Sequence, residues 1–299
     1  MTEPGDDAVP MVSVIIPHHA DLRALDICLT ALAAQTWPRD RTQIIVADND
    51  SPEGEAAVGE TMAGRASLIT VRERGAGPAR NGGAALATGD ILAFTDCDCR
   101  PEPGWLAAGV AALSDHDFAG GRMVVLVEDP ARMTPAEAFE RVFAFDNESY
   151  VKRKQFTVSA NLFCPRTVFE TVGGFGVGLS EDLDWCRRAA SAGYRIGYAP
   201  AAAVGHPARR TWAELERKWR RLDAESFALF AAKPGGRALW LIRALALPFS
   251  AIAHTPKALT SPALATLGQR MAALSMLYRL RWWRLWDSLA LGARGGRAP

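Results

Sequence analysis

The sequence predicts an α/β fold built on a mostly parallel β-sheet that helices cover on both faces. Between residues 12 and 95, short apolar runs of β-type residues alternate with segments whose apolar residues recur at helical spacing. This alternation is typical of parallel strands joined by crossover helices. In addition, Asp48 and Asp96 each follow an apolar run directly, and open α/β sheets bind ligands outside the carboxyl ends of their strands.

The first half of the chain supplies these elements in order. Pro17 ends the first strand, since proline donates no hydrogen bond to a sheet. Leu22, Leu25 and Leu29 mark the apolar face of the first helix, and Gly89 ends the third. The predicted strands are 12–17, 44–47, 68–71 and 91–95, and the predicted helices between them are 21–35, 53–63 and 79–88.

The second half of the chain is less regular. Its glycine-rich segment, residues 173–178, predicts a flexible loop, and Gly193 ends the helix that follows. We predict strands at 121–127 and 156–163, a long helical region at 135–154, and helices at 165–172 and 183–192.

Length and composition fit one large domain with an appendage. Of the 299 residues, 49% are hydrophobic and 22% are charged, so the chain has material for a core and no disorder signature. The net charge of +1 hides an asymmetry, because residues 233–299 hold ten Lys or Arg and one acid and sum to +9, leaving −8 for residues 1–232. With a hinge at 233–236, we predict a main domain at 10–232 and a basic, aromatic tail at 233–299.

The tail predicts contact with a membrane surface. Residues 263–291 fit an amphipathic helix in which Trp282, Trp283 and Trp286 would be interfacial anchors. No uncharged apolar run in the tail reaches 18 residues, so we expect no conventional membrane span. Peripheral contact with an anionic membrane is our interpretation, and a helical cap on the main domain or a dimer contact is the alternative. We expect no nucleic-acid partner, because no recognition motif accompanies the charge.

The N-terminus and the cysteines indicate a cytoplasmic protein. Acidic residues precede the first apolar run, so the pattern of a signal peptide is missing. The five cysteines are odd in number and lack zinc-site spacing, which predicts reduced thiols. The expected location is the cytoplasm, peripheral on the inner face of the cell membrane.

Two acidic motifs predict the chemistry. Asp-x-Asp occurs four times, but only the copies at Asp48 and Asp96 end an apolar β-type run. The carboxylates of Asp96 and Asp98 suit a hard divalent cation such as Mg²⁺ or Mn²⁺, and such a cation bridges nucleotide phosphates and neutralises a departing diphosphate. The later pair Glu181-Asp182 adds a candidate general base. Together the motifs indicate a metal-dependent transferase that uses a nucleotide-activated donor.

These motifs, in this order and spacing, resemble those of the family 2 glycosyltransferases, inverting enzymes of the GT-A fold. The likeness covers about residues 11–231. The resemblance implies a GT-A type nucleotide-diphospho-sugar transferase fold, with a mostly parallel sheet flanked by helices, followed here by a C-terminal helical appendage. The matching segments are 12–17, 44–51, 77–83, 87–90, 96–98, 159–163, 172–175 and 181–188.

The resemblance also implies roles for the acidic residues and one histidine. Asp182, with Glu181 beside it, would be the general base that takes the proton of an acceptor hydroxyl. Asp98 would bind the metal directly, and Asp96 would contact the ribose or reach the metal through water. His206 resembles a late histidine that ligates the metal in some members.

On the donor side, the resemblance assigns Asp48 to the nucleotide base, since a carboxylate accepts the imide N–H of uracil. Arg80 would pair with the diphosphate, and Asn81 would cap or position its loop. Trp185 would stack on a sugar or pack in the core, and the loop 173–178 would move to admit the acceptor. The predicted nucleotide-sugar site is completed by residues from the matching strand ends and turns: Pro17, Cys97 and Asn161.

The implied reaction moves one sugar from a nucleotide-diphosphate sugar, with UDP-sugars favoured, to a hydroxyl of a glycan or lipid-linked acceptor, as in cell-envelope polysaccharide assembly. Mn²⁺ or Mg²⁺ would be the cofactor. The Gln-x-x-Arg-Trp signature of processive members is missing, so we expect one sugar per encounter. Residues 18–20 read His-His-Ala where many members carry a Thr-Tyr-Asn-like turn, which leaves the base and ribose contacts open.

Two other functions remain open. A nucleotidyltransferase shares the sheet and the metal, but it would need a basic glycine-rich loop where this chain has residues 18–20. A non-catalytic scaffold recruited to membranes by its tail is the second alternative. A dehydrogenase is disfavoured, because the glycines at 75 and 77 lack a third and follow the third strand. The sugar, the acceptor and any homo-oligomer are left open.

Overall fold

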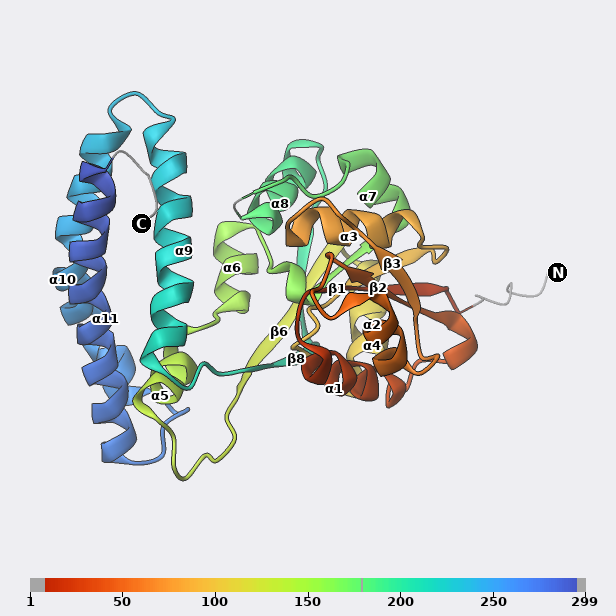
Figure 1. Ribbon diagram of the computed structural model, residues 1–299, viewed down its shortest axis with the longest axis horizontal. Helices are drawn as coiled ribbons and strands as arrows, with labels where there is room; N and C mark the ends of the chain where they lie inside the picture. Colours follow the sequence, from red (N-terminus) through yellow and green to blue (C-terminus); the bar gives the residue numbers. More distant parts are fainter. Residues whose placement is uncertain (1–8, 179, 295–299) are drawn as a thin grey trace. The chain divides into compact units, whose positions relative to one another are not determined.

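A computed structural model describes residues 9–178 and 180–294 (Figure 1). The chain forms two compact units. Unit 1 comprises the residues up to Val124 and residues Asp146–His206, and unit 2 comprises Val125–Phe145 and the residues from Pro207 onward. The predicted boundary at residue 232 lies inside unit 2, because the helices on both sides of it pack together there.

An eight-stranded sheet has the order β3-β2-β1-β4-β7-β6-β8-β5. β1 pairs in parallel with β2 and β4, and β2 with β3, whereas β7 is antiparallel to β4 and β6, and β5 is antiparallel to β8. The predicted α/β fold is confirmed, and the sheet is parallel in the half where strands and helices alternate. The strands are β1 (Val12–His18), β2 (Thr42–Asp48), β3 (Ser67–Thr70), β4 (Ile91–Phe94), β5 (Arg100–Pro101), β6 (Phe118–Leu126), β7 (Leu162–Pro165) and β8 (Ile196–Pro207).

The observed elements differ from the predicted segments mainly after residue 130. The region 135–154 is two helices, because residues 144–146 break the helical path and Asp146 takes a φ of −143°. Most of the predicted strand 156–163 is irregular chain followed by a 3-10 helix (Ser159–Asn161) that leads into β7. β8 was not predicted, since its alanine-rich sequence lacks a β pattern. The helices are α1 (Leu22–Ala33), α2 (Gly54–Met62), α3 (Ala76–Ala85), α4 (Trp105–Ala111), α6 (Asn147–Lys154), α7 (Arg166–Val172) and α8 (Glu181–Ser191).

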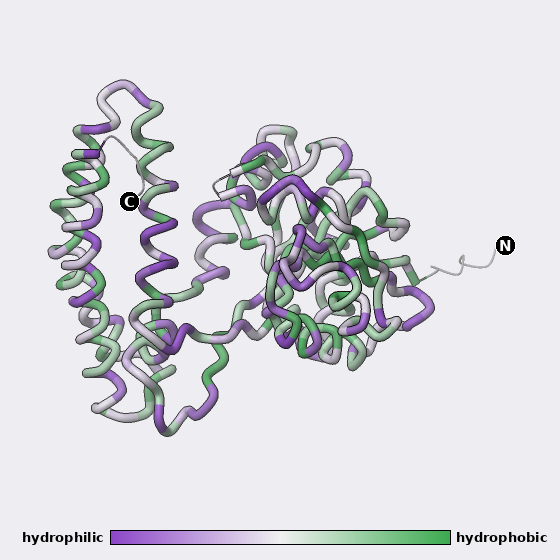
Figure 2. The backbone as a smooth tube through the Cα atoms, in the orientation of Figure 1, coloured by the Kyte–Doolittle hydropathy of each residue, from purple (hydrophilic) through white to green (hydrophobic). Residues whose placement is uncertain are grey.

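Two apolar clusters cover the two faces of the sheet. Val14 and Ile16 of β1 join the cluster that contains the buried residues of α1, α2 and α4, whereas Ile15 joins the cluster that contains those of α7 and α8, as alternation along a strand requires. Figure 2 shows hydrophobic residues concentrated in the strands at the centre of unit 1. Gly83 lets α3 lie close to β1, since a Cβ there would stand 2.6 Å from Cγ2 of Ile15. Because β1 is parallel to both β2 and β4, the carboxyl ends of these three strands lie at one edge of the sheet.

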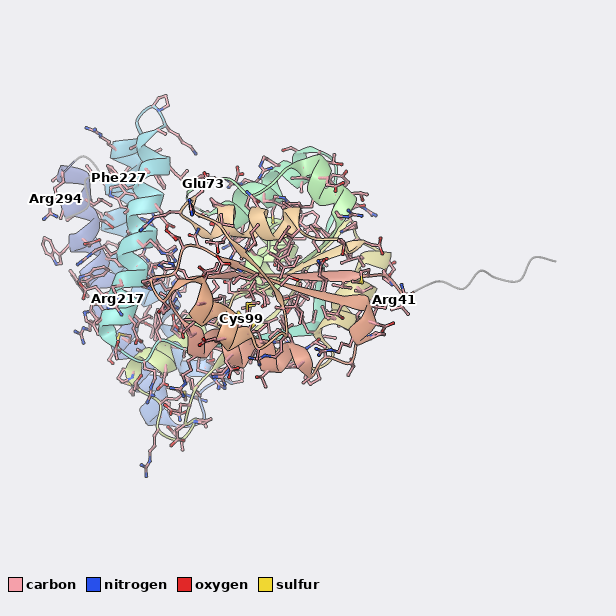
Figure 3. The ribbon with its side chains drawn as sticks, turned by 45° about the vertical axis from the view of Figure 1, so that its right-hand side comes forward. Arg41, Glu73, Cys99, Arg217, Phe227 and Arg294 are labelled. Carbon is pink, nitrogen blue, oxygen red and sulfur yellow. The ribbon has the colours of Figure 1, made fainter. Side chains whose placement is uncertain are left out.

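Unit 2 contains four long or amphipathic helices. An apolar cluster that includes Phe139, Leu215, Ala251 and Leu277 joins all four. The helices are α5 (Pro135–Phe143), α9 (Trp212–Ala231), α10 (Gly236–Thr260) and α11 (Leu267–Ala293). Arg217 and Phe227 both project from α9 (Figure 3). Arg217 is exposed and Phe227 is buried. The predicted tail helix corresponds to α11.

Among the residues that the structure describes, α10 is the one helix long and apolar enough to cross a membrane by length and composition. We had expected no such helix, because charges and prolines interrupt the sequence. The helix nevertheless continues through Pro248 and Pro256, and its most apolar window of 18 residues holds at most two charged side chains and is 22% buried. Such a helix alone is weak support for a membrane span.

Candidate active site

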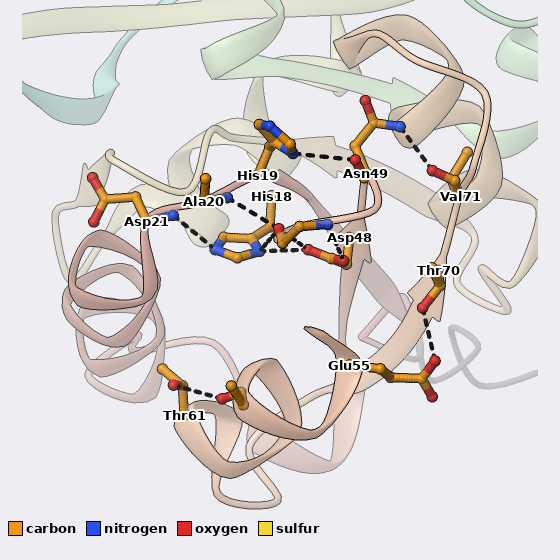
Figure 4. A network of polar contacts seen from close by, with 12 residues as sticks. His18, His19, Ala20, Asp21, Asp48, Asn49, Glu55, Thr61, Thr70 and Val71 are labelled. Atoms are coloured by element: carbon orange, nitrogen blue, oxygen red, sulfur yellow. Dashed lines mark hydrogen bonds and ion pairs between the residues drawn. The ribbon is translucent and has the colours of Figure 1, made fainter. Parts of the chain in front are cut away.

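The carboxyl ends of β1 and β2 carry a buried polar network (Figure 4). The Oδ1 atom of Asp48 lies 2.8 Å from Nδ1 of His18 and accepts a hydrogen bond from the Ser51 hydroxyl, and Oδ2 accepts one from the Ser51 N–H at 3.0 Å. His18 and Asp48 are each 1% exposed. Burial would raise the pKa of Asp48, but the hydrogen bonds from Ser51 and His18 outweigh it and hold the pKa below its ordinary value.

The network bears on the predicted contact between Asp48 and the nucleotide base. In this structure the carboxylate of Asp48 contacts Ser51 and His18 and so links the ends of β1 and β2, and a uracil N–H would add to or replace these contacts. Aspartate side chains commonly close hydrogen-bonded turns with the residues that follow them, so the sequence carries a signal for the contact with Ser51. His18, which departs from the family pattern, is the second partner.

Asn49 secures the loop that leads to α3. Its amide donates to the carbonyls of Val71 (2.8 Å) and Glu73 (2.7 Å), and its Oδ1 accepts from the N–H of Gly75 at 2.8 Å. Gly75 has a φ of +127°, a backbone conformation that favours glycine. The start of α3 is thus fixed beside the carboxyl end of β2.

Arg80 of α3 joins the two acidic motifs. Its Nη2 lies 2.6 Å from Oδ1 of Asp96 and its Nη1 lies 2.7 Å from Oε1 of Glu181, and the guanidinium stands over the ring of Phe175. The residue is 3% exposed. Burial would lower the pKa of Arg80, but the charges of Asp96 and Glu181 raise it above its ordinary value. The predicted partner of Arg80 was a diphosphate, whereas its partners in the structure are two carboxylates.

Asn81 holds the glycine-rich loop. Its side-chain amide pairs with both backbone groups of Phe175, donating to the carbonyl at 2.8 Å and accepting from the N–H at 2.7 Å. Trp185 and Arg188 of α8 donate to carbonyls of the same segment, at residues 172–174. The first part of the loop that we predicted to move is therefore tied down on two sides.

Asp182 lies at the start of α8, beside Glu181. Burial and the neighbouring charge of Glu181 raise the pKa of Asp182 to about 6, although the Leu183 N–H and Arg80 lower it. A carboxyl group with such a pKa suits a general base. Asp182 also contributes to the raised pKa of the Tyr150 phenol, behind burial and Asp146, which places α6 on the border of the site. Nothing in the sequence pattern had pointed to Tyr150.

Asp98 and His206 lie together, with Oδ2 of the carboxylate 3.3 Å from Nε2 of the imidazole. Strand pairing explains the contact: β5 begins two residues after Asp98, and its Arg100 pairs with Gly205 of β8, the neighbour of His206. The carboxylate suits Mn²⁺ or Mg²⁺, whereas the imidazole nitrogen suits a transition-metal ion better than it suits Mg²⁺. No cluster of three or more His, Cys, Asp or Glu side chains of metal-binding geometry occurs within the described ranges, so substrate or water oxygens would complete the shell.

The structure shows the surroundings of the four remaining predicted site residues. Asn161 is fully buried and bonds to Trp105 and to the carbonyls of Arg122 and Ala202. Trp185 is fully buried against Phe118 and Phe169, so it packs in the core. Pro17 pairs with Ala47 within the parallel sheet. Burial and the charges of Asp98 and Asp96 raise the pKa of Cys97 to about 12, so its thiol stays protonated at neutral pH.

Known proteins resemble the chain in sequence. A family model described as glycosyl transferase family 2 matches residues 13–178. The chain is 31% identical over 220 residues to glycosyltransferase AglE of Haloferax volcanii, covering 71% of this chain and 72% of that protein. It is 33% identical over 150 residues to the pre-mycofactocin glycosyltransferase of Mycobacterium tuberculosis, covering 46% of this chain and 32% of that protein.

Solved structures share the fold. The mannosyltransferase PcManGT from Pyrobaculum calidifontis, solved with GDP-Man and Mn²⁺, superimposes with a TM-score of 0.60 at 21% identity, covering 97% of this chain and 90% of that chain. GalNAc-T7, solved with UDP, GalNAc and Mn²⁺, gives a TM-score of 0.54 at 19% identity, covering 69% of this chain and 45% of that chain.

Proposed function

The chain belongs to glycosyl transferase family 2, and from this premise we propose that it transfers one sugar, with inversion and with a divalent cation, from a nucleotide-diphosphate sugar to a hydroxyl of a glycan or lipid-linked acceptor. Glycosyl transfer and the GT-A type fold follow from family membership and the structural neighbours. The stereochemistry, the cation, the donor and the acceptor are our proposal.

The contact of Arg80 with both acidic motifs carries the proposal. Its guanidinium lies within 2.7 Å of the carboxylates of Asp96 and Glu181. The end of β4, which would face the donor phosphates, is thereby held close to the start of α8, which carries the candidate base. A single bound donor is then within reach of both motifs.

Asp182 would act as the general base. With a pKa of about 6, it is largely ionised at neutral pH and close to the value that best suits proton transfer. The acceptor oxygen attacks the anomeric carbon while the bond from that carbon to the diphosphate oxygen breaks, and the hydroxyl proton passes to Asp182. One displacement from the opposite side inverts the anomeric centre.

Asp98 and His206 would hold the cation, Mn²⁺ or Mg²⁺. When bound, the cation neutralises the charge of the leaving nucleoside diphosphate. Two protein ligands suit an ion that keeps waters and substrate phosphates in its shell. Asp96, held by Arg80, would contact the ribose or reach the cation through water.

UDP-sugars are our first candidates for the donor. GDP-sugars are the second candidates. Both nucleotides occur among the structural neighbours, since PcManGT was solved with GDP-Man and GalNAc-T7 with UDP. The missing processive signature supports the addition of one sugar per encounter. We place the reaction in the cytoplasm, with the basic tail in peripheral contact with the anionic inner leaflet, where a lipid-linked acceptor would be presented.

A nucleotide-release assay tests the proposal. The full chain is mixed with UDP-, GDP- and dTDP-sugars and with Mn²⁺ or Mg²⁺, next to Asp98→Ala and the control Asp115→Ala, which changes an exposed aspartate of another Asp-x-Asp copy. We expect release from one donor that needs metal, is lost in Asp98→Ala and is kept in the control. Absence of donor binding by calorimetry with metal present would contradict the proposal.

A further inference from the structure

Helix α10 has one packed face and one exposed apolar face. Its packed face, which includes Trp240, Ala244, Leu247 and Ala251, is buried inside unit 2. Its outer face exposes large apolar side chains at helical spacing over about three turns: Leu241 (44% exposed), Ile242 (64%), Leu245 (57%), Phe249 (72%) and Ile252 (61%). A contiguous apolar surface of this kind marks an interaction site.

Charges bound this outer face at both ends and are missing between them. Between Arg237 and Lys257, which are roughly 30 Å apart along the helix, the sequence of α10 holds one charged residue, Arg243. The Arg243 guanidinium turns toward α9, 3.4 Å from Asp223, and stands over the ring of Trp240. The exposed strip is therefore uncharged along its length, with exposed cations at its two ends.

We propose that the outer face of α10 is the surface through which the protein docks on an anionic lipid bilayer. The proposal rests on the membrane contact proposed above and names the surface that makes it. The exposed cations at the ends of the strip, Arg237 and Lys257, complement anionic headgroups. A second copy of the chain would bring two such basic surfaces together, which like-charge repulsion opposes.

Part of α11 contributes to the same kind of contact. Trp282 and Trp286 are 50% and 65% exposed and lie four residues apart, hence on one face of the helix. Tryptophan at this position suits the boundary between headgroups and acyl chains. The apolar stripe that first suggested membrane contact is partly used for packing, because Leu277 of α11 and Leu264, which precedes the helix, are buried. This leaves α10 as the main lipid-binding surface.

The helix lies in the membrane surface and does not cross it. α10 packs on α9 through Trp240 against Phe227, and Asp223 of α9 binds Arg284 of α11 at 2.6 Å, so the helices hold together as one unit. α9 carries eight charged side chains, which exclude it from the hydrocarbon core: Glu214, Glu216, Arg217, Lys218, Arg220, Arg221, Asp223 and Glu225. A bundle built this way embeds one apolar face and keeps the rest in water.

Vesicle sedimentation tests the surface. The full chain is sedimented with phosphatidylcholine vesicles, with and without phosphatidylglycerol. The double variant Leu245→Glu/Phe249→Glu is compared with the control Val9→Glu/Leu86→Glu, which adds the same charge at two exposed apolar residues of unit 1. We expect binding that requires phosphatidylglycerol, a loss of at least about tenfold in affinity for the α10 variant, and wild-type affinity for the control. Thermal melts check that both variants fold.

The outcomes separate the two proposals. If the α10 variant binds vesicles with wild-type affinity, α10 is not the docking surface, but the proposed membrane contact is not contradicted. No binding to either vesicle would overturn both, and a dimer in gel filtration would then identify a second copy as the partner. Retention in the membrane pellet after carbonate extraction at high pH would overturn the surface-bound arrangement in favour of a span. Nucleotide release measured on the same samples reports the catalytic proposal separately.

Discussion

Replacing Arg80 with methionine removes the cation that joins the two acidic motifs while keeping a long side chain in the core. In the native protein the guanidinium makes two charge-assisted hydrogen bonds, to Asp96 and to Glu181. Without it, two carboxylates face each other across the space that it occupied. We therefore expect Arg80→Met to lower both the stability of unit 1 and the activity.

The magnitude follows from burial. Breaking a buried ion pair by removing one partner costs about 3–5 kcal/mol. The side chains of Asp96 and Glu181 are 32% and 20% exposed, so water replaces part of the lost contact and we expect about 2–3 kcal/mol. For a unit of this size, that corresponds to a fall in Tm of roughly 4–12 °C. Arg80→Lys keeps the charge but cannot bridge both carboxylates, so it should lie in between.

The pH dependence of activity distinguishes positioning from mere stability. The charge of Arg80 is one of the influences that lower the pKa of Asp182, against burial and Glu181, which raise it to about 6. Because a general base works when deprotonated, activity should rise with pH through this value. Loss of Arg80 raises the pKa of Asp182 further, so the acid limb of kcat/KM should move to higher pH. Nucleotide release measured across pH gives the limb.

The control for this experiment is Arg23→Met, which removes an exposed arginine of α1 and should change neither Tm nor the pH profile. An Arg80→Met protein with native Tm and an unmoved acid limb would refute the reasoning. A rise in KM for the donor with unchanged kcat would instead return Arg80 to the diphosphate contact that the family resemblance implied.

Three further predictions concern the supports of the site. Asn81→Ala should cost about 1–3 kcal/mol, because two backbone groups of Phe175 lose their partner, and hydrogen exchange should rise in the loop 173–178. Ser51→Ala should lower Tm at pH 7, and the difference in Tm from wild type should shrink on acidification. The pKa of Asp48 is lower in the folded protein than its unfolded value of about 3.9. The stability that this shift contributes is present above the unfolded pKa and is lost as pH falls through the folded pKa. His206→Ala should raise the Mn²⁺ concentration needed for half-maximal nucleotide release by about tenfold or more, because loss of even a supporting group at a metal site costs about tenfold in metal affinity. Metal-independent release would contradict the assigned role.

The sequence predicted the parallel half of the sheet because every element there leaves a local signal. Apolar runs, leucine spacing and strand-end aspartates place β1, β2 and β4 without any long-range information. The antiparallel half left weaker signals: β8 is rich in alanine, and β7 begins where a turn ends. The sequence likewise predicted one helix at 135–154 where the structure has α5 and α6, because the residues between them contain neither glycine nor proline and so give no local signal of a break.

The candidate site residues leave local signals in the sequence, whereas their contacts do not. Asp98 and His206 were both predicted as metal ligands, and strand pairing places them 3.3 Å apart. The partners of Arg80, Asn161 and Trp185, in contrast, depend on residues far along the chain; Glu181 is 101 residues from Arg80. A motif identifies such a residue, but only the folded chain shows whether it faces a substrate or holds another part of the protein.

The most direct test of the proposed reaction compares wild type with Asp182→Asn, using the donor found in the release assay. Donor affinity is measured by calorimetry with Mn²⁺ present, and turnover by nucleotide release. The variant should bind the donor with nearly wild-type affinity and lose activity by a factor of about 10² to 10⁴, the usual contribution of a general base. Turnover at the wild-type rate would show that Asp182 is not the base.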